Sequence, residues 1–421
     1  MKVLVLGSGS REHALCWRLR QSPSVKELFC APGNPGTASV AKNISIDVSD
    51  IHGLVEFALH NSIDLTIAGP ELPLSLGVAD LFIAKGLRIF GPVKEAAKIE
   101  GSKSYAKEIM SAANVPTADY KTFFDKDSAS KFCDQHGVPL VIKADGLAGG
   151  KGVCVCTEEN QIKEALNFVF TEIKASQVVV EDFLDGTEAS YIVAAAGDII
   201  VAMASSHDYK RLLDRQRGPN TGGMGSVSPT PNLKPEQDLW VIDHVIKPTL
   251  NELKKRGTPF CGFLYAGLMI DKHGKIKVLE FNARMGDPEC QSIMRRYKGD
   301  FAELLFSLAS LSLNESSESL PSFEWINDSC VTIVAAASGY PAAFKKGDEI
   351  LGIENAENIS DVKVFQGGTV LNASGKLVTA GGRVLSITAL GKDLEEARQK
   401  AYRAADIIQF KGMHIRRDVG R

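Results

Sequence analysis

The stretch "VIKADGLAGGKGV" (Val141–Val153) joins an apolar run to a loop of glycines and lysine. The apolar run predicts a buried strand, and a glycine-rich loop beside lysine is typical of phosphate binding. A P-loop would need Gly at position 145 and Ser or Thr at position 152, where this chain has Asp145 and Gly152. A second strand also follows the loop, where a P-loop would begin a helix. The stretch is therefore not a P-loop.

The same stretch fits a glycine-rich turn between two antiparallel strands that covers phosphates as a flexible lid. Backbone N–H groups of the turn would donate hydrogen bonds to the phosphates, and Lys143 and Lys151 would neutralise their charge. The alternative is a plain flexible hairpin. Four glycines and two lysines within this stretch favour the phosphate site.

The first 100 or so residues alternate short apolar strands with helical segments, such as "KVLVLG" before a helix expected from Glu12. This alternation predicts a parallel sheet with ligand-binding loops at the carboxyl ends of its strands. The glycine-rich "GSGS", "APGNPG" and "AGPE" all fall at such ends. A dinucleotide fingerprint would need a glycine in place of Glu12 and an acid after the second strand, so NAD binding is disfavoured. An anion held near Gly7 and Gly9 at the helix N-terminus is favoured over a merely tight turn.

The pattern of expected helices and strands changes at Gly101. A capped helix in "GSKSYAKEIMSAANVP" is followed by strands, by helices expected over 158–170 and 235–256, and by hairpins turning at Gly197-Asp198 and "KHG". The Ser/Glu-rich "SLNESSESLPS" reads as a solvated linker. The last 95 or so residues are expected to form short strands and one helix over 393–409.

The segment "LEFNARMGDPE" carries the densest chemistry. On a strand, Glu280 and Asn282 point to the same face, and Leu279 and Phe281 are expected to point to the other. A carboxylate and an amide oxygen are hard ligands that suit a magnesium ion bridging nucleotide phosphates. Arg284 continues the alternation and could clamp a carboxylate or an acyl phosphate. An exposed sheet face with a salt bridge is the alternative, and the functional interpretation is favoured.

The loop "HDYKRLLDRQRGPNTGGMGSVSP" is long, charged and rich in glycine. Long loops without periodicity inside a compact region are usually functional or disordered, and "GPNTGGMG" is too specific for a linker. We therefore interpret it as substrate-handling. Glu188, on an expected strand after "EDFLDG", could accept hydrogen bonds from ribose hydroxyls, although such a residue alone is more often a surface acid.

Composition excludes several classes of protein. The 421 residues have a formal net charge of -3 and lack a basic nucleic-acid footprint. No apolar run approaches the roughly 20 residues that span a bilayer, and the start does not read as a signal peptide. Eight scattered cysteines without a CxxC pair indicate free thiols in a reducing cytoplasm. We expect no nucleic-acid or membrane partner.

Together, "GSKSYAK", "VIKADGLAGGKGV", "VEDFLDGTEAS", "GPNTGGMG" and "LEFNARMGDPE" resemble an ATP-grasp ligase. With "REHAL", "APGNPGT", "DLTIAGPE" and "GGRVLSITALG", essentially the whole chain resembles the phosphoribosylamine–glycine ligase (glycinamide ribonucleotide synthetase) family of purine biosynthesis. The resemblance implies that the carboxylate of glycine attacks the γ-phosphate of ATP. The amine of 5-phosphoribosylamine then displaces phosphate from glycyl phosphate. Catalysis is then mostly positioning and charge neutralisation, and no protein nucleophile is needed.

The resemblance also implies an α/β fold: a Rossmann-like parallel-sheet domain, an ATP-grasp α+β core with a small lid, and a small mostly-β domain. The corresponding ranges are 1–101, then 102–190 with the lid at about 115–190, 191–320, and 325–421. The protein is expected to be a monomer or homodimer.

By position, the resemblance assigns residues to each ligand. ATP would be bound by Lys103, Lys143, Gly149, Gly150, Lys151, Gly152, Glu181, Phe183, Leu184 and Glu188. Mg²⁺ (or Mn²⁺) would be bound by Glu280 and Asn282, and catalysis would depend on Arg284, Asp208 and Lys151. Glycine, its acyl phosphate and the aminosugar would be bound by Gly9, Asn34, Gly36, Glu71, Asn220, Thr221, Gly222, Gly223, Arg284 and Arg383.

Four positions depart from the usual pattern of the family. Ser10 interrupts "GGREHA", Tyr209 stands where histidine is common, and Gln216 stands where an acid is common. The glycine-rich segment before "VVVEDFL" is shortened to "TEIKASQ", which predicts a smaller lid. Alternatives to the ligase are another ATP-grasp enzyme, a nicotinamide oxidoreductase and a non-catalytic nucleotide sensor. The motif "GPNTGGMG" counts against another ATP-grasp enzyme, and Glu12 counts against an oxidoreductase. A sensor would be expected to have lost Lys151, Glu280 or Arg284, and all three are retained.

Overall fold

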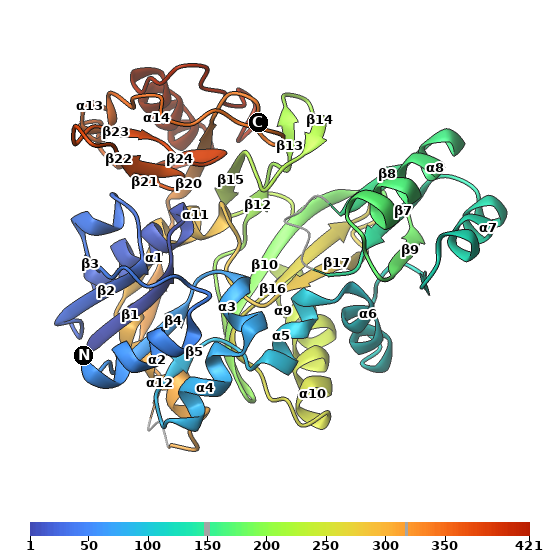
Figure 1. The fold of residues 1–421 in the computed structure, drawn as a ribbon, viewed down its shortest axis with the longest axis horizontal. Helices are drawn as coiled ribbons and strands as arrows, with labels where there is room; N and C mark the ends of the chain where they lie inside the picture. The colour runs from blue at the N-terminus through green and yellow to red at the C-terminus, as the bar shows by residue number, and fades with distance from the viewer. Residues whose placement is uncertain (147–151, 316–318) are drawn as a thin grey trace.

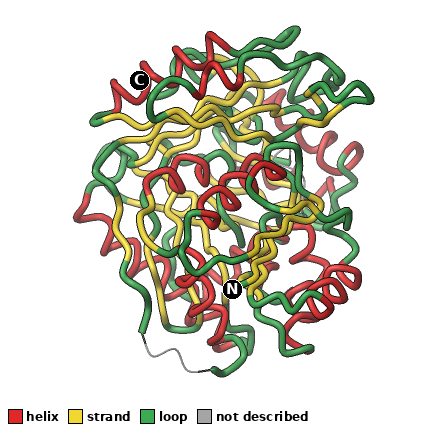
Figure 2. The backbone as a smooth tube through the Cα atoms, turned by 90° about the vertical axis from the view of Figure 1, so that its left-hand side faces the viewer, coloured by secondary structure: helices red, strands yellow, loops and turns green. Residues whose placement is uncertain are grey.

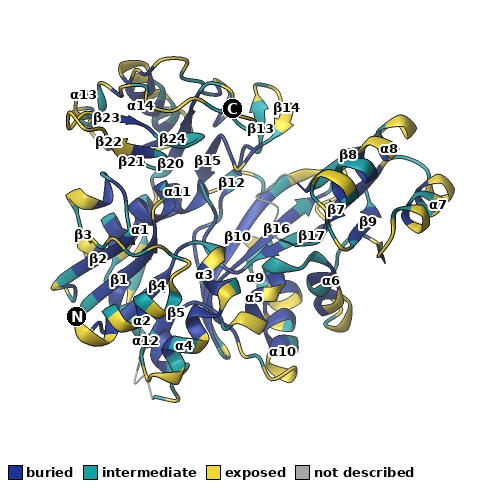
Figure 3. Ribbon diagram, viewed as in Figure 1, coloured by how far each residue is buried: buried dark blue, intermediate teal, exposed yellow. Residues whose placement is uncertain are grey.

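The computed structural model describes residues 1–146, 152–315 and 319–421. Within them, four sheets of four or five strands carry the fold, and helices cover their faces (Figure 1). Strands of the C-terminal sheet run across the top of the molecule in Figure 2, above the N-terminal region. Figure 3 shows that the central strands are buried while the outer helix faces are exposed.

The N-terminal sheet has parallel strands in the order β3-β2-β1-β4-β5. Apart from the exposed edge strand β3, its strands are short runs of buried, largely aliphatic residues, as expected for a parallel sheet covered on both faces. The predicted parallel sheet is confirmed, and the helix expected from Glu12 begins two residues earlier at Ser10. The elements are β1 (Lys2–Gly7), α1 (Ser10–Arg20), β2 (Glu27–Pro32), β3 (Lys42–Asn43), α2 (Ile51–His60), β4 (Leu65–Ala68), α3 (Glu71–Leu76), α4 (Val78–Ala84), β5 (Ile89–Phe90) and α5 (Lys94–Gly101).

A small sheet in the order β6-β9-β7-β8 follows, with α7 and α8 packed on it around a separate hydrophobic core. Its strands β7 and β8 are antiparallel neighbours on either side of the glycine-lysine loop, as predicted. The helix expected over 158–170 ends at Asn167 and continues as a π-helical turn, Phe168–Glu172. The elements are α6 (Lys103–Ala112), β6 (Tyr120–Phe123), α7 (Lys126–His136), β7 (Leu140–Ala144), β8 (Val153–Cys156), α8 (Glu159–Asn167) and β9 (Val178–Asp182).

The third sheet, in the order β11-β10-β16-β17, is antiparallel and shares a hydrophobic core with the N-terminal region. Both predicted hairpins are present: β10 turns into β11, and β16 turns into β17. The predicted helix over 235–256 is interrupted by a π-helical turn, Ile242–Ile246. The elements are β10 (Thr187–Ala196), β11 (Ile199–Ala202), α9 (Pro235–Val241), α10 (Lys247–Lys255), β16 (Cys261–Ile270) and β17 (Ile276–Asn282).

The C-terminal sheet has the order β12-β15-β20-β24-β21, so two of its strands come from the long loop after β11. The loop is thereby tied to the C-terminal region, which pattern reasoning did not foresee. One short helix, α13, adds to the single helix expected there. The elements are β12 (His207–Asp208), β13 (Arg211–Leu213), β14 (Arg217–Asn220), β15 (Gly225–Ser228), α11 (Glu289–Arg296), β18 (Tyr297–Gly299), α12 (Phe301–Leu311), β19 (Phe323–Trp325), β20 (Ser329–Ala336), α13 (Ile353–Glu357), β21 (Val362–Gln366), β22 (Thr369–Leu371), β23 (Leu377–Thr379), β24 (Arg383–Gly391) and α14 (Leu394–Ile407).

Candidate active site

A cavity of about 910 Å³ brings together residues from all of these regions. It includes most of the residues that the sequence singled out. Those that line it are Glu71, Lys103, Lys143, Gly152, Glu181, Phe183, Leu184, Glu188, Asp208, Asn220, Thr221, Gly222, Glu280, Asn282, Arg284 and Arg383. Gly9, Asn34, Gly36 and Gly223 are not among the lining residues. Gly149, Gly150 and Lys151 lie outside the described residues.

Two lysines meet one carboxylate on the strand side of the cavity. Lys143 on β7 and Lys107 on α6 both pair with Glu181 on β9, with Lys107 Nζ 2.5 Å from the carboxylate. Lys143 also donates to the carbonyl oxygen of Leu279 at 3.0 Å. All three charged side chains are nearly fully buried, so the cluster carries a net positive charge against a low-dielectric wall. Such a wall favours an anionic ligand.

Lys103 adds a third, half-buried cation, at the start of α6. Its Nζ donates to the Gly146 carbonyl oxygen at 3.2 Å, beside the glycine-lysine loop. Burial lowers the pKa of Lys103 more than the nearby carboxylate charges, chiefly that of Glu280, raise it. A phosphate next to this ammonium would therefore stabilise its charged form.

Glu280 lies at the centre of the cavity, next to a lysine that the sequence did not single out. Lys210 Nζ is 3.7 Å from Glu280 and 3.1 Å from Glu188, so one ammonium bridges two carboxylates. Burial acts to raise the pKa of Glu280, but the charges of Lys210, Lys143 and Lys103 outweigh it and lower that pKa. Burial acts to lower the pKa of Lys210, but Glu188 and Glu280 raise it well above its ordinary value. Both groups are therefore ionised at neutral pH.

Strict alternation along β17 does not hold. Gly267 pairs with Glu280 and Leu268 pairs with Val278, so Leu279 is an extra residue in the strand. A β-bulge of this kind re-aims side chains. Leu279 consequently lines the same cavity as Glu280, where the sequence predicted the opposite face.

Arg284 is held between two carboxylates. Its Nη2 is 2.8 Å from Glu100, its Nε is 3.2 Å from Glu71, and Nη2 also donates to Asn282 Oδ1 at 3.3 Å. Burial raises the pKa of Glu100 in spite of this pairing. Burial also acts to raise the pKa of Glu71, but Arg284 and Arg11 lower it. Arg284 thus connects the N-terminal region to the end of β17.

Asp208 on β12 is buried against the glycine-rich loop. Among the described residues, its Oδ1 atom has no hydrogen-bond partner. A Cβ on Gly223, whose φ is +108°, would lie 2.6 Å from that oxygen, so glycine is needed there. Burial and the neighbouring charge of Glu289 raise the pKa of Asp208 well above its ordinary value. A cationic group of a ligand placed here would restore the carboxylate.

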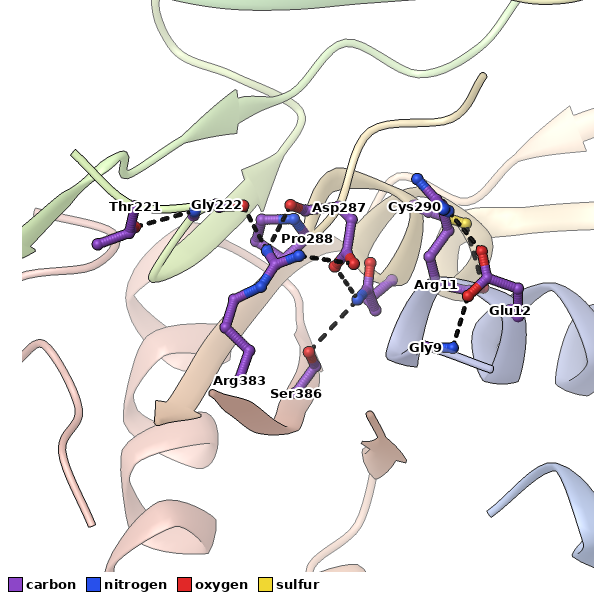
Figure 4. Close-up of polar contacts among 12 residues, drawn as sticks. Gly9, Arg11, Glu12, Thr221, Gly222, Asp287, Pro288, Cys290, Arg383 and Ser386 are labelled. Carbon is purple, nitrogen blue, oxygen red and sulfur yellow. Dashed lines mark hydrogen bonds and ion pairs between the residues drawn. The ribbon is translucent and has the colours of Figure 1, made fainter. Parts of the chain in front are cut away.

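Arg383 on β24 reaches from the C-terminal region to the glycine-rich loop. Its Nη1 donates to the carbonyl oxygens of Gly222 and Asp287, and its Nη2 pairs with the Asp287 carboxylate at 2.8 Å (Figure 4). The guanidinium lies between these two segments in Figure 4. Arg383 therefore both lines the cavity and joins two of its walls.

Glu12 occupies the helix N-terminus where a dinucleotide phosphate would lie. Its Oε2 accepts from the Gly9 N–H at 2.6 Å, and its Oε1 accepts from Arg11 Nε at 2.6 Å (Figure 4). A Cβ on Gly7, whose φ is +124°, would lie 2.4 Å from the Glu12 side chain. The carboxylate thus fills the end of α1, which explains why the third glycine is absent. Ser10 is the first residue of α1, so its Cβ meets no restriction there.

The side chain of Asn34 is fully engaged within the protein. Its Nδ2 donates to the carbonyl oxygens of Ser8 and Gln366, both at 2.8 Å, and its Oδ1 accepts from the Thr37 N–H at 2.9 Å. A Cβ on Gly36 would lie 2.4 Å from the ring of His13. Both positions therefore join the N-terminal region to β21 and shape the loop there.

Among the cavity residues that sequence reasoning did not assign are Lys107, Lys210, Glu100, Asp287 and Glu289. Four of them lie within motifs that had been quoted, "GSKSYAK", "HDYKR" and "MGDPE". A lysine next to Asp208 in a substrate loop was a usable signal for Lys210. Glu100 gave no such signal, because it lies on an ordinary amphipathic helix.

Similarity to known proteins extends over the whole chain. Residues 1–100, 101–290 and 330–421 match the N domain, the ATP-grasp (A) domain and the C domain of phosphoribosylglycinamide synthetase. The chain belongs to the phosphoribosylglycinamide synthetase family. The predicted family, the α/β fold class with an ATP-grasp core, and the ligase class are confirmed.

Individual relatives agree with this assignment. A phosphoribosylamine–glycine ligase of Vibrio vulnificus (strain CMCP6) is 48% identical over 427 residues, covering 100% of this chain and 98% of that protein. One of Yersinia pestis is 45% identical over 426 residues, with coverages of 100% and 98%. A crystal structure of phosphoribosylamine–glycine ligase from Thermotoga maritima is 33% identical, with a TM-score of 0.82 and coverages of 99% and 100%.

More distant structures share the fold alone. The biotin carboxylase domain of Hydrogenobacter thermophilus 2-oxoglutarate carboxylase, in complex with MgADP, ADP and bicarbonate, is 16% identical to this chain. It superposes with a TM-score of 0.72 and covers 98% of this chain and 91% of its own.

Proposed function

We propose that this chain joins glycine to 5-phosphoribosylamine, giving glycinamide ribonucleotide, ADP and phosphate, in de novo purine biosynthesis. Full-length similarity to proteins named phosphoribosylamine–glycine ligase supports this reaction. The observation that carries it is the cavity in which the charges of three lysines, Lys210, Lys143 and Lys103, act on an ionised Glu280. Cations for the phosphates of ATP and oxygen ligands for their counter-ion then lie side by side.

ATP is held along β7, β9 and β17. The phosphates are held by Lys103, Lys143 and Lys151, which neutralise their charge. The loop glycines Gly149, Gly150 and Gly152 donate hydrogen bonds to them through backbone N–H groups. The segment from Glu181 to Leu184 lines the adenine, and Glu188 accepts from the ribose hydroxyls. The buried positive charge around Lys143 supports this assignment, because an anionic ligand is favoured against a low-dielectric wall.

Glu280 and Asn282 fit a magnesium ion (or Mn²⁺). One ionised carboxylate and one amide oxygen line the cavity, and the described residues hold no group of three His, Cys, Asp or Glu that would cage a metal alone. Magnesium is typically bound by one or two protein oxygens together with substrate phosphates. When bound, the ion neutralises the phosphate charge that develops during transfer.

The chemistry proceeds in two displacements. A carboxylate oxygen of glycine attacks the γ-phosphorus, the bond to the β-phosphate oxygen breaks, and ADP leaves. The amine of the aminosugar then attacks the glycyl carbon, the carbon–oxygen bond breaks, and phosphate leaves with that oxygen while the amine loses a proton. Arg284, Asp208 and the segment from Asn220 to Gly223 orient glycine and its acyl phosphate, so positioning supplies most of the rate. The unpartnered Asp208 Oδ1 suits the ammonium group of glycine.

The aminosugar phosphate binds toward the N-terminal region, among Gly9, Asn34, Gly36 and Glu71, with Arg383 reaching it from β24. Because the polar atoms of the Asn34 side chain are engaged, Asn34 and Gly36 act through backbone groups and loop shape. We further propose the domain division 1–101, 102–190, 191–320 and 325–421, with the lid at about 115–190.

We place the reaction in the cytoplasm, in keeping with eight free cysteines. None of the helices in the described residues is long and apolar enough to cross a bilayer.

Phosphate release tests the proposal directly. ATP and magnesium are supplied with phosphoribosylamine generated in the cuvette, with and without glycine. We expect release only when both glycine and the aminosugar are present. Release with neither substrate indicates an uncoupled ATPase, and no release despite ATP binding indicates a nucleotide sensor; either result overturns the proposal.

A further inference from the structure

The segment 413–421 packs on the hairpin formed by β13 and β14. Its backbone and side chains contact β13, the turn that follows it, and Tyr209 just before the hairpin. The contacts are the Arg417 N–H donating to Asp214 Oδ1 at 2.8 Å, the Arg215 N–H donating to Asp418 Oδ2 at 2.7 Å, the Gly420 N–H donating to the Tyr209 hydroxyl at 2.9 Å, and His414 Nε2 lying 2.9 Å from the Leu212 carbonyl oxygen. The hairpin is thereby fixed to the C-terminal region at both its base and its turn.

Arg416 is the centre of this contact. It is only 1% exposed, and its guanidinium forms a two-pronged pair with Asp418 at 2.8 and 2.9 Å. Its remaining Nη1 donates to the Arg211 carbonyl oxygen at 3.0 Å and to Gln216 Oε1 at 3.3 Å. The guanidinium also lies 5.1 Å from the centre of the Tyr209 ring, within range of a cation–π interaction. One buried side chain thus reaches both ends of the hairpin.

The turn that Arg416 contacts is conformationally unfavourable. Arg215 has a φ of +59° and Gln216 a φ of +55°, the left-handed region that favours glycine. Side chains with a Cβ keep such backbone angles only where the surrounding structure holds them in place. Here the Arg215 N–H is held by Asp418 and the Gln216 side chain by Arg416. The turn therefore depends on the segment 413–421.

The same hairpin carries one wall of the cavity. Asp208 and Lys210 line the cavity just before it, and Thr221 and Gly222 line it just after. The two sides are joined where the Thr221 N–H donates to the Lys210 carbonyl oxygen at 2.8 Å. A shift of the hairpin would consequently move these groups relative to β17.

We propose that Arg416 is a positioning residue that sets the geometry of the glycine-binding wall through the β13–β14 hairpin. This inference rests on the proposed function for the identity of the ligand. Tyr209 and Gln216, two positions at which this sequence departs from the usual pattern of the family, are the side chains that Arg416 contacts. The two departures and Arg416 therefore form one structural unit in this chain.

Substitution of Arg416 by methionine in the full chain tests the inference. We expect KM for glycine to rise about tenfold, because misplacement of positioning groups weakens productive binding, and KM for ATP to change less than about twofold. Amide hydrogen exchange across residues 208–224 should become faster in the ligand-free protein, as expected when a restrained segment opens locally. Arg417→Met is the matched control, since that side chain pairs with Asp406 at the exposed surface. It should leave both readouts unchanged.

Two milder variants keep the test decisive if Arg416→Met does not fold. Tyr209→Phe removes the hydroxyl that accepts from Gly420, and Gln216→Ala removes an exposed contact of Arg416. Each should raise KM for glycine and the exchange rate, as Arg416→Met does, but by a smaller factor. Wild-type exchange and wild-type KM for glycine in a folded Arg416→Met, or in both milder variants, overturn the inference. A uniform loss of activity with no change in exchange across 208–224 also overturns it.

The exchange measurement needs no catalysis, so it separates this inference from the proposed function. Faster exchange in a chain that never couples ATP to glycine would refute the ligase and leave the role of Arg416 in holding the hairpin intact.

Discussion

The end of β17 and the loops after β1 and β2 were both expected to bind ligands. They differ in how far their polar groups are already hydrogen-bonded within the protein. On β17, Glu280 and Asn282 line the cavity. Among the described residues, Glu280 has Lys210 alone within salt-bridge distance, while Asn282 Oδ1 accepts from Arg284 at 3.3 Å. After β1 and β2, the Gly9 N–H donates to Glu12, and both the amide nitrogen and the amide oxygen of Asn34 are hydrogen-bonded to the backbone. A group that the fold leaves available is a better candidate ligand contact than one that the fold has already satisfied.

The difference follows from the kinds of residue involved. The Glu280 side chain is partly exposed and ionised among lysines in the cavity lining, so it can meet a ligand or counter-ion there. Glycines and asparagines in turns have equally good structural uses, since glycine permits close approach and the asparagine amide caps backbone groups. Their presence in a loop therefore predicts a shape more reliably than a contact.

The largest expected effect is on β17. Glu280→Gln removes the charge without changing the size of the side chain, and kcat should fall on the order of 10³-fold, as when a group that stabilises developing charge is lost. The melting temperature should change little. Lys277→Gln, on the same strand but outside the cavity lining, is the control. A Glu280→Gln variant with near wild-type turnover would contradict the role given to this strand.

Arg284→Ala should be the most destabilising change. It leaves the carboxylates of Glu71 and Glu100 without their shared counter-ion, and breaking a buried pair in this way costs about 3 kcal/mol of unfolding free energy. Urea unfolding measures the loss. Adding Glu100→Gln to the variant should recover part of it, and no recovery would argue against Glu100 as the main partner.

Asn34→Ala should separate structural from ligand contacts in the N-terminal loops. Loss of three buried hydrogen bonds predicts a decrease in unfolding free energy of about 2 kcal/mol, with KM for the aminosugar nearly unchanged. Thermal unfolding and steady-state kinetics give the two values. A stable variant with a greatly raised KM would make Asn34 a direct ligand contact and remove the contrast drawn above.

The smallest effect concerns His13, which accepts from the Gln366 N–H and joins α1 to β21. Burial lowers the pKa of His13 from 6.5 to about 3, so between these values the unfolded chain binds a proton that the folded chain does not. This contribution of His13 to the free energy of unfolding is present above pH 6.5. It is lost as the pH falls through this window, by about 1 kcal/mol between pH 7 and pH 5.5. His13→Asn should lessen the slope of unfolding free energy against pH; an unchanged slope would refute this account.

Much of the fold could be predicted because its signals are local. The alternation of strands and helices before Gly101 and the turns at Gly197 and "KHG" depend on residues close in sequence. The pairing of β15 with β20, which brings β12 into the same sheet, was not predictable, because strands distant in sequence carry no local mark of their partner. The bulge at Leu279 was missed because strict alternation of side chains was assumed along β17.

The candidate site shows the same difference between local and distant signals. Charged residues within strands and motifs, such as Glu280 and Lys143, were recognised from residue type and spacing. Lys210 was missed although it stands near Asp208 in a quoted loop, because its place between Glu188 and Glu280 depends on the folded course of that loop. The hydrogen bond from Asn34 to the Gln366 carbonyl oxygen joins residues 332 positions apart, so it too could not be predicted from the sequence.

The most direct measurement follows the oxygen atoms of glycine. Glycine labelled with ¹⁸O in its carboxylate is supplied with ATP, magnesium and the aminosugar, and the released phosphate is analysed by mass spectrometry. Attack of the carboxylate on the γ-phosphorus predicts that each phosphate carries one labelled oxygen. Unlabelled phosphate accompanying formation of the amide product would contradict an acyl phosphate and, with it, the chemistry assigned to this cavity.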